Sequence, residues 1–174
     1  GQGVDALIQA FHHKGGRTRL RVAPVKFLAS IVTISSGGSG GYEGPVSQIG
    51  GALSSGVAGL FNMPRALRRT LMLAGTAAGL SAVFKAPLGG ALTSVEMLYH
   101  EDFESGALVS SIVASVVAFA VFTAWAGTTP AFGGVPPFSF HGGWDLLAAL
   151  ALGALCAPFS WLFVWGYTRS MAFF

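Results

Sequence analysis

Cysteine and charge are both scarce in this sequence. The single cysteine, Cys156, excludes an internal disulfide framework. Charged residues make up only 10% of the chain, and the stretches 27–42, 70–84, 105–140 and 146–168 carry none. With 52% hydrophobic residues, the chain is too apolar for an ordinary soluble domain. We therefore predict an integral membrane protein in which no soluble domain is seen.

The few basic residues give a formal net charge of +3, which we do not interpret as a sign of nucleic-acid binding. They gather in a loop, Lys14–Arg21, and at the start of an expected helix, Arg65–Arg69, where lipid headgroups or a cytoplasmic position explain them. No charged segment followed by a short apolar run opens the chain, so no signal peptide is predicted. The missing start methionine and the apolar end at Phe174 predict a fragment of a longer protein.

Glycine, by contrast, is abundant, and its densest run leads to an isolated acid. The run Gly37–Gly41, interrupted only by a serine, is followed by Tyr42, Glu43, Gly44 and Pro45. Proline after a glycine-rich turn is typical of the first position of a helix, which places Glu43 just before or at a helix N-terminus. Free amides and the positive dipole end bind anions there, and a carboxylate can occupy the same place. An ionisable residue inside a membrane is a functional candidate.

The apolar segments predict about seven helices of unequal length and no strand. Glycine and proline interrupt several of them, which is typical of partial or tilted helices buried in protein. Small residues in 51–59 and 75–79 would let helices approach closely. The segment 103–126 is expected to be the one span that can cross a bilayer alone. The expected helices are 5–13, 22–36 with an early break at Pro24, 45–61, 65–84, 87–99, 103–126 and 145–167.

Two clusters of metal-ligating residue types do not have the arrangement of a metal site. His12 and His13 are adjacent but lack a third ligand nearby. His100, Glu101 and Asp102 are also neighbours in sequence, and neighbours on a helix point in different directions. We predict no metal and no cofactor.

The glycine run with its acid resembles the gating motif of a known family. In the ClC chloride channel and transporter family, a Gly-Arg/Lys-Glu-Gly-Pro motif carries the gating glutamate, and Tyr42–Pro45 followed by Val46–Gly51 is similar to it. Three further stretches agree in order and spacing. Residues 1–4 resemble the Gly-Ser-Gly-x-Pro anion loop, 22–27 the helix before the gate, and 77–96 the helix pair after it. The resemblance covers nearly the whole chain.

The resemblance implies a fold and an activity. The fold would be all-α, an antiparallel inverted repeat of tilted, broken helices that assembles as a homodimer with one pore per subunit. Residues 1–174 would be a single transmembrane domain fragment, the later part of the first repeat and the start of the second. The implied activity is transport of chloride, or another small anion, across a lipid bilayer. We expect a multi-pass protein of a bacterial inner membrane, with 96–112 at the dimer contact.

The resemblance also implies site residues, with Glu43 as the gate. Glu96 and Met97 stand where proton-coupled members often carry two acids. Because Met97 aligns with the second acid, proton-coupled exchange by the usual route is not expected. Tyr42 stands where the family usually has a base, which removes a positive charge beside the gate. Gln2 replaces a serine, so a preference for fluoride or nitrate stays open. The implied anion-binding residues are Gln2, Gly3, Val4, Gly41, Tyr42, Glu43, Gly44 and Pro45.

Two other classes of function stay open. A membrane enzyme could use Glu43 as a general base, although no Ser-His or Cys-His arrangement and no metal-ligand spacing accompanies it. A non-conducting membrane scaffold could use the same acid only to cap a helix. Anion flux carried by the full-length protein in liposomes would separate these hypotheses.

Overall fold

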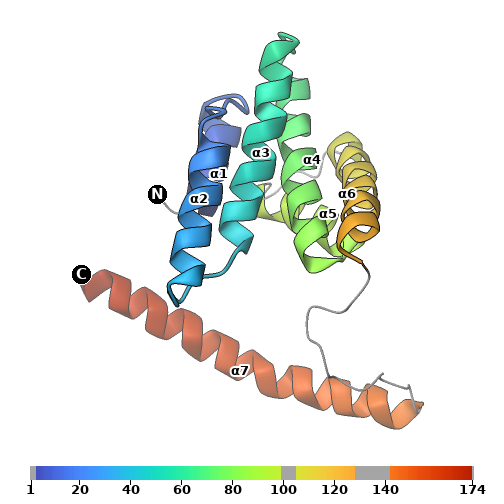
Figure 1. Ribbon diagram of the computed structural model, residues 1–174. Coiled ribbons are helices and arrows are strands. Elements are labelled where there is room, and N and C mark those ends of the chain that lie inside the picture. The colour runs from blue at the N-terminus through green and yellow to red at the C-terminus, as the bar shows by residue number, and fades with distance from the viewer. Residues whose placement is uncertain (1–2, 99–104, 128–141, 174) are drawn as a thin grey trace. The chain divides into compact units, whose positions relative to one another are not determined.

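The computed structural model describes residues 3–98, 105–127 and 142–173, and within these ranges it contains helices and no strand (Figure 1). The predicted all-α fold is therefore confirmed. Helices α1 to α6 belong to one compact unit and α7 to a second. The helices are α1 (Gly3–His13), α2 (Val22–Ser35), α3 (Glu43–Leu60), α4 (Arg65–Phe84), α5 (Pro87–Leu98), α6 (Ser105–Ala126) and α7 (Gly143–Phe173).

Pro45 and Pro24 each lie in the first turn of a helix. The sequence predicted that a helix starts at Pro45 and that another breaks at Pro24. Helix α3 begins at Glu43, two residues before Pro45, and Pro24 is the third residue of an α2 that continues to Ser35. The expected start at Pro45 and the expected break at Pro24 are wrong. The reason is that the N–H groups of a first turn have no intrahelical partner, so proline loses no hydrogen bond there.

The core of the first unit forms around one face of α1. Leu7 and Phe11 lie one turn apart on that helix and are 1% and 2% exposed, so the short helix buries a single stripe. Their buried partners come from three later helices, which ties α1 to the far part of the unit. These partners are Met72 and Leu73 of α4, Leu98 of α5 and Ala107 of α6.

Polar contacts hold the C-terminal end of α1 in this core. The guanidinium of Arg69 lies 5.4 Å from the centroid of the Phe11 ring and donates to the His12 carbonyl at 3.0 Å. The His12 Nε2 atom is in turn 2.8 Å from the Leu98 carbonyl oxygen. Contacts with α4 and α5 thereby fix the position of the C-terminal end of α1, and this in turn sets the position of its N-terminus.

Helices α3 and α4 cross at two glycines. A Cβ atom added to Gly50 would collide with the carbonyl oxygen of Gly75, and one added to Gly75 would collide with the carbonyl of Gly50 and the side chain of Ser54. Further along, a Cβ on Gly79 would lie 2.9 Å from the Val46 carbonyl oxygen. The close contact predicted from the small residues of α4 is confirmed, and its main partner on α3 is Gly50.

Two helices of the described ranges are long and apolar enough to span a membrane, Gly106–Ala126 and Gly143–Met171. The expectation that 103–126 would be the one such span is therefore wrong. The second span belongs to α7, which runs over 31 residues with Pro158 inside it.

Candidate functional site

Two helix N-termini meet at a pair of glycines. Gly3 is the first residue of α1 and Gly44 the second residue of α3. Their backbones touch, because a Cβ added to Gly3 would lie 2.8 Å from the Gly44 carbonyl oxygen and 3.2 Å from its Cα. Each N-terminus carries unpaired N–H groups and a partial charge of about +0.5. The junction therefore combines the positive ends of two helix dipoles.

The first turn of α3 leaves a specific pair of amides at this junction. The N–H of Val46 donates to the Tyr42 carbonyl at 2.9 Å and closes the first turn. Pro45 has no N–H to offer. The amides of Glu43 and Gly44 precede this first bond, which makes them the donors that α3 presents at its end.

The carboxylate of Glu43 lies against the turn that precedes it. A Cβ added to Gly41 would be 3.6 Å from the Glu43 Oε2 atom, so the side chain folds back over the glycine run. Tyr42 packs on Phe84 at the end of α4, with ring centroids 6.2 Å apart. The acid therefore lies beside the helix end that would otherwise attract a free anion.

A cavity of about 570 Å³ lies beside the junction. It is lined at one side by Val4, Glu43 and Gly44, and at another by Met97 of α5. Glu96 is exposed and is not among the lining residues. Of the two residues expected on a proton pathway, the structure thus brings Met97 and not Glu96 into the same space as Glu43.

Ser47 is a polar residue of this cavity that the sequence analysis missed. Its side chain is 0% exposed, and its Oγ has no hydrogen-bond partner among the described residues. It lies four residues after Glu43, one helical turn on, and lines the same cavity. A hydroxyl at this spacing after a helix-starting acid was visible in the sequence, but its burial was not. An unsatisfied buried polar group costs about 1–3 kcal/mol, so a bound anion or water would be favourable here.

The residues predicted to bind the anion have several different positions. Val4, Glu43 and Gly44 line the cavity, and Gly3 contacts Gly44. Of the remaining four, three are described and do not line it. Gly41 and Tyr42 are exposed in the turn before α3, Pro45 is half-buried in the first turn, and Gln2 lies outside the described residues.

The sequence of the whole chain, residues 1–174, matches the family described as voltage gated chloride channel. The chain belongs to this family. Membership in the voltage-gated chloride channel family confirms the resemblance found in the sequence. It also confirms an all-α membrane fold and a membrane protein.

The relatives of this chain include channels and transporters. A chloride/fluoride channel protein of Pseudomonas syringae pv. tomato is 34% identical over 159 residues, which cover 88% of this chain and 34% of the relative. The chloride channel protein CLC-e of Arabidopsis thaliana is 34% identical over 139 residues, covering 76% of this chain and 19% of that protein. The H⁺/Cl⁻ exchange transporter ClcA of Cronobacter sakazakii is 38% identical over 107 residues, which cover 59% of this chain and 23% of that transporter.

The chain spans about a third or less of the length of these three relatives. No solved structure matches it. The names of the relatives are those of channels and transporters rather than of enzymes.

Proposed function

We propose that the full-length protein transports chloride across a membrane and that Glu43 is its gate. The junction of two helix N-termini supports this proposal most directly, because the Glu43 carboxylate lies there and lines a cavity. A chloride ion would compete with the carboxylate for the same positive backbone. Three relatives whose names include chloride give further support.

Chloride efflux from liposomes that contain the purified full-length protein tests this proposal. With a potassium ionophore present to balance charge, we expect efflux well above that of protein-free liposomes. A scaffold that only caps a helix with Glu43 would give efflux equal to the protein-free control, and that result would contradict the proposal. An enzyme using Glu43 as a base is less well supported, since no described histidine or cysteine lines the cavity.

Fluoride is a second candidate substrate, because one relative is named a chloride/fluoride channel protein. The same liposomes loaded with fluoride and read with a fluoride electrode would measure it. A higher rate for fluoride than for chloride at equal gradients would make fluoride the preferred anion. A lower rate would leave chloride as proposed.

We infer that the Ser47 hydroxyl donates a hydrogen bond to an anion or water in the cavity. Ser47→Ala should lower chloride efflux about fivefold, the equivalent of one hydrogen bond of about 1 kcal/mol. The stability of the protein should not fall, because the variant removes a buried hydroxyl that has no partner. Liposome efflux and thermal unfolding of the same preparation measure the two effects.

Ser94→Ala is the matched control for this prediction. Ser94 is also 0% exposed, but its Oγ donates to the Ala91 carbonyl at 2.9 Å and it does not line the cavity. Efflux through this variant should equal that of the unmodified protein. If Ser47→Ala and Ser94→Ala transport equally well, Ser47 does not contact the anion pathway.

We also propose a homodimer in a bacterial inner membrane, crossed several times by each chain. Helix α6 supports a contact with lipid or a second copy, because Val109, Val113 and Val117 recur every four residues and are 61%, 58% and 56% exposed. Such a face has to be covered by lipid or protein. Light scattering of the full-length protein in detergent would contradict the dimer if it gave the mass of one chain.

A further inference from the structure

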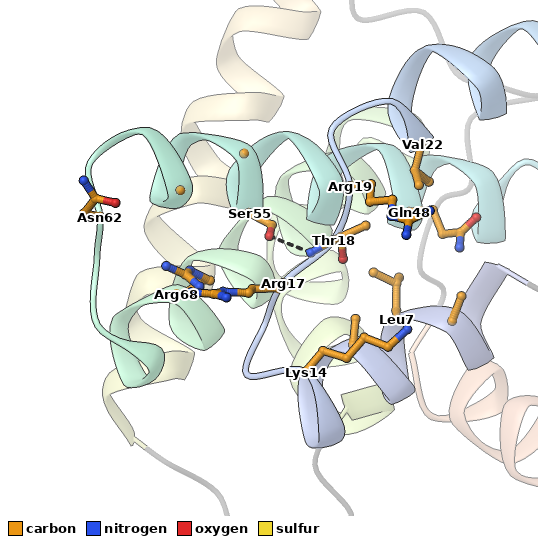
Figure 2. A pocket seen from close by; sticks show the side chains of 14 residues that line it. Leu7, Lys14, Arg17, Thr18, Arg19, Val22, Gln48, Ser55, Asn62 and Arg68 are labelled. Carbon is orange, nitrogen blue, oxygen red and sulfur yellow. Dashed lines mark hydrogen bonds between the residues drawn. The ribbon is translucent and has the colours of Figure 1, made fainter.

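A second cavity, of about 960 Å³, lies along α3 on the side of the connection between α1 and α2 (Figure 2). Its walls come from α1, that connection, α3 and the start of α4. It includes none of the residues that line the cavity beside Glu43. The volume is within the range of sites that hold small molecules, about 300–1,000 Å³.

The lining of this cavity is strongly basic. Lys14, Arg17, Arg19 and Arg68 contribute to it, and no acidic residue is among the described lining residues. Positive charges gathered in a concave, partly apolar space repel one another and raise the local concentration of anions. The cavity is therefore suited to an anion that several bases can share.

Arg68 is the most informative of these bases. Its side chain is only 6% exposed, and one Nη atom donates to the Met63 carbonyl at 3.0 Å. This hydrogen bond satisfies one donor of the Arg68 guanidinium and caps the backbone that follows α3. Its Nε has no hydrogen-bond partner among the residues that the structure describes. A buried guanidinium with open donors is unfavourable unless an acceptor joins it.

The other groups of the cavity are positioned to supply that acceptor with more donors. Figure 2 shows the Arg17 side chain, from the connection, directed toward Arg68 of α4. The buried Oγ1 of Thr18 has no partner in the described structure, and its hydroxyl can donate. Guanidinium groups present a planar fork of N–H donors that matches the oxygens of a phosphate.

The connection that carries Arg17 is fixed in place. The N–H of Thr18 donates to the Ser55 Oγ at 2.9 Å, the bond drawn in Figure 2, and that hydroxyl donates to the Gly16 carbonyl at 2.6 Å. Gly16 has a φ of +75° and lies so close to α4 that an added Cβ would be 3.0 Å from the backbone nitrogen of Arg69. The backbone that carries Arg17 is thus held before any ligand arrives.

We propose that this cavity binds a phosphate group, either free phosphate or the headgroup of an acidic phospholipid. A phosphate offers several oxygens at once, which matches two guanidinium groups and a hydroxyl better than a single halide does. Clusters of Lys and Arg at a membrane surface attract such headgroups. The proposal stands apart from chloride transport, since the two cavities share no lining residue.

Binding to the full-length protein in detergent tests this site with two probes. Inorganic phosphate is titrated calorimetrically, and short-chain phosphatidylglycerol is added during thermal unfolding, with phosphatidylcholine as the neutral lipid. We expect a measurable heat of binding with inorganic phosphate, or a higher melting temperature with phosphatidylglycerol than with phosphatidylcholine. Arg17→Gln should weaken the affinity for that phosphate source about tenfold, because the substitution removes charge-assisted hydrogen bonds.

Arg21→Gln is the matched control, because Arg21 belongs to the same connection, is exposed and does not line the cavity. It should leave binding unchanged. An Arg68→Gln variant is informative if it folds, and Arg17→Gln answers the question if it does not, since Arg17 is exposed.

Each outcome decides the proposal. A response to inorganic phosphate that Arg17→Gln weakens supports a free phosphate site, and a response to phosphatidylglycerol alone supports a lipid headgroup. No response to either probe would overturn the proposal and would indicate that another part of the protein fills the cavity. An equal response in Arg17→Gln and Arg21→Gln would overturn it as well.

Discussion

Glu43→Gln is expected to raise chloride efflux and to remove most of its dependence on external pH. In the unmodified protein the ionised carboxylate would occupy the positive end of α3, and protonation at low pH would release it. Efflux should therefore rise as the pH falls. The glutamine has nearly the same size and no charge, so its efflux should match the low-pH rate at every pH. A charge at a helix N-terminus contributes up to about 2 kcal/mol, which allows an increase of about tenfold near neutral pH.

Liposome efflux measured across a pH series checks this expectation. Glu96→Gln is the control, because it makes the same chemical change at an exposed residue that does not line the cavity. Its pH dependence should equal that of the unmodified protein. Should Glu43→Gln keep the full pH dependence, Glu43 would not be the gate.

Met97→Glu is expected to increase proton movement driven by a chloride gradient, which should be small or absent in the unmodified protein. A thioether cannot carry a proton, whereas acids inside membrane proteins mark proton pathways. Met97 lines the same cavity as Glu43, so the new carboxylate would share that space with the gate. The exposed Glu96 is one residue away but outside the lining.

A pH electrode in a weakly buffered suspension of liposomes measures this proton movement under a chloride gradient. Passive chloride efflux should persist in the unmodified protein. Glu96→Gln should change neither flux. Strong chloride-driven proton uptake by the unmodified protein, lost in Glu96→Gln, would contradict the expectation and would assign the proton pathway to Glu96.

The sequence predicted the helices well because each follows from local composition. Uncharged apolar runs bounded by glycine, proline or bases gave the order of the seven described helices, and the position of Glu43 at a helix start needed only its neighbours. The exact places of Pro24 and Pro45 within a first turn were missed because proline is compatible with a break and with several first-turn positions.

The site was predictable only in part, because it depends on contacts between distant residues. Without the family resemblance, nothing near Gly3 indicates that it would touch Gly44 on another helix. Burial is equally invisible in a sequence, and Ser47 resembles many serines on apolar helices until its neighbours are known. The basic residues from Lys14 to Arg19 were predicted as a loop at the membrane surface, whereas the structure gathers them with Arg68 around one cavity.

The crossing of α3 and α4 has a mechanical consequence. Gly50 and Gly75 bring backbone against backbone, and only the short side chain of Ser54 lies beside this contact, which leaves the helices little room to slide or tilt. The two helices should therefore move as one rigid body, and flexibility should concentrate in the glycine turn before α3, where Gly37 has a φ of +82°. A gate at Glu43 would then open by rotation about the bonds of its own side chain. Such rotations of exposed side chains take on the order of nanoseconds or less, far faster than helix displacements.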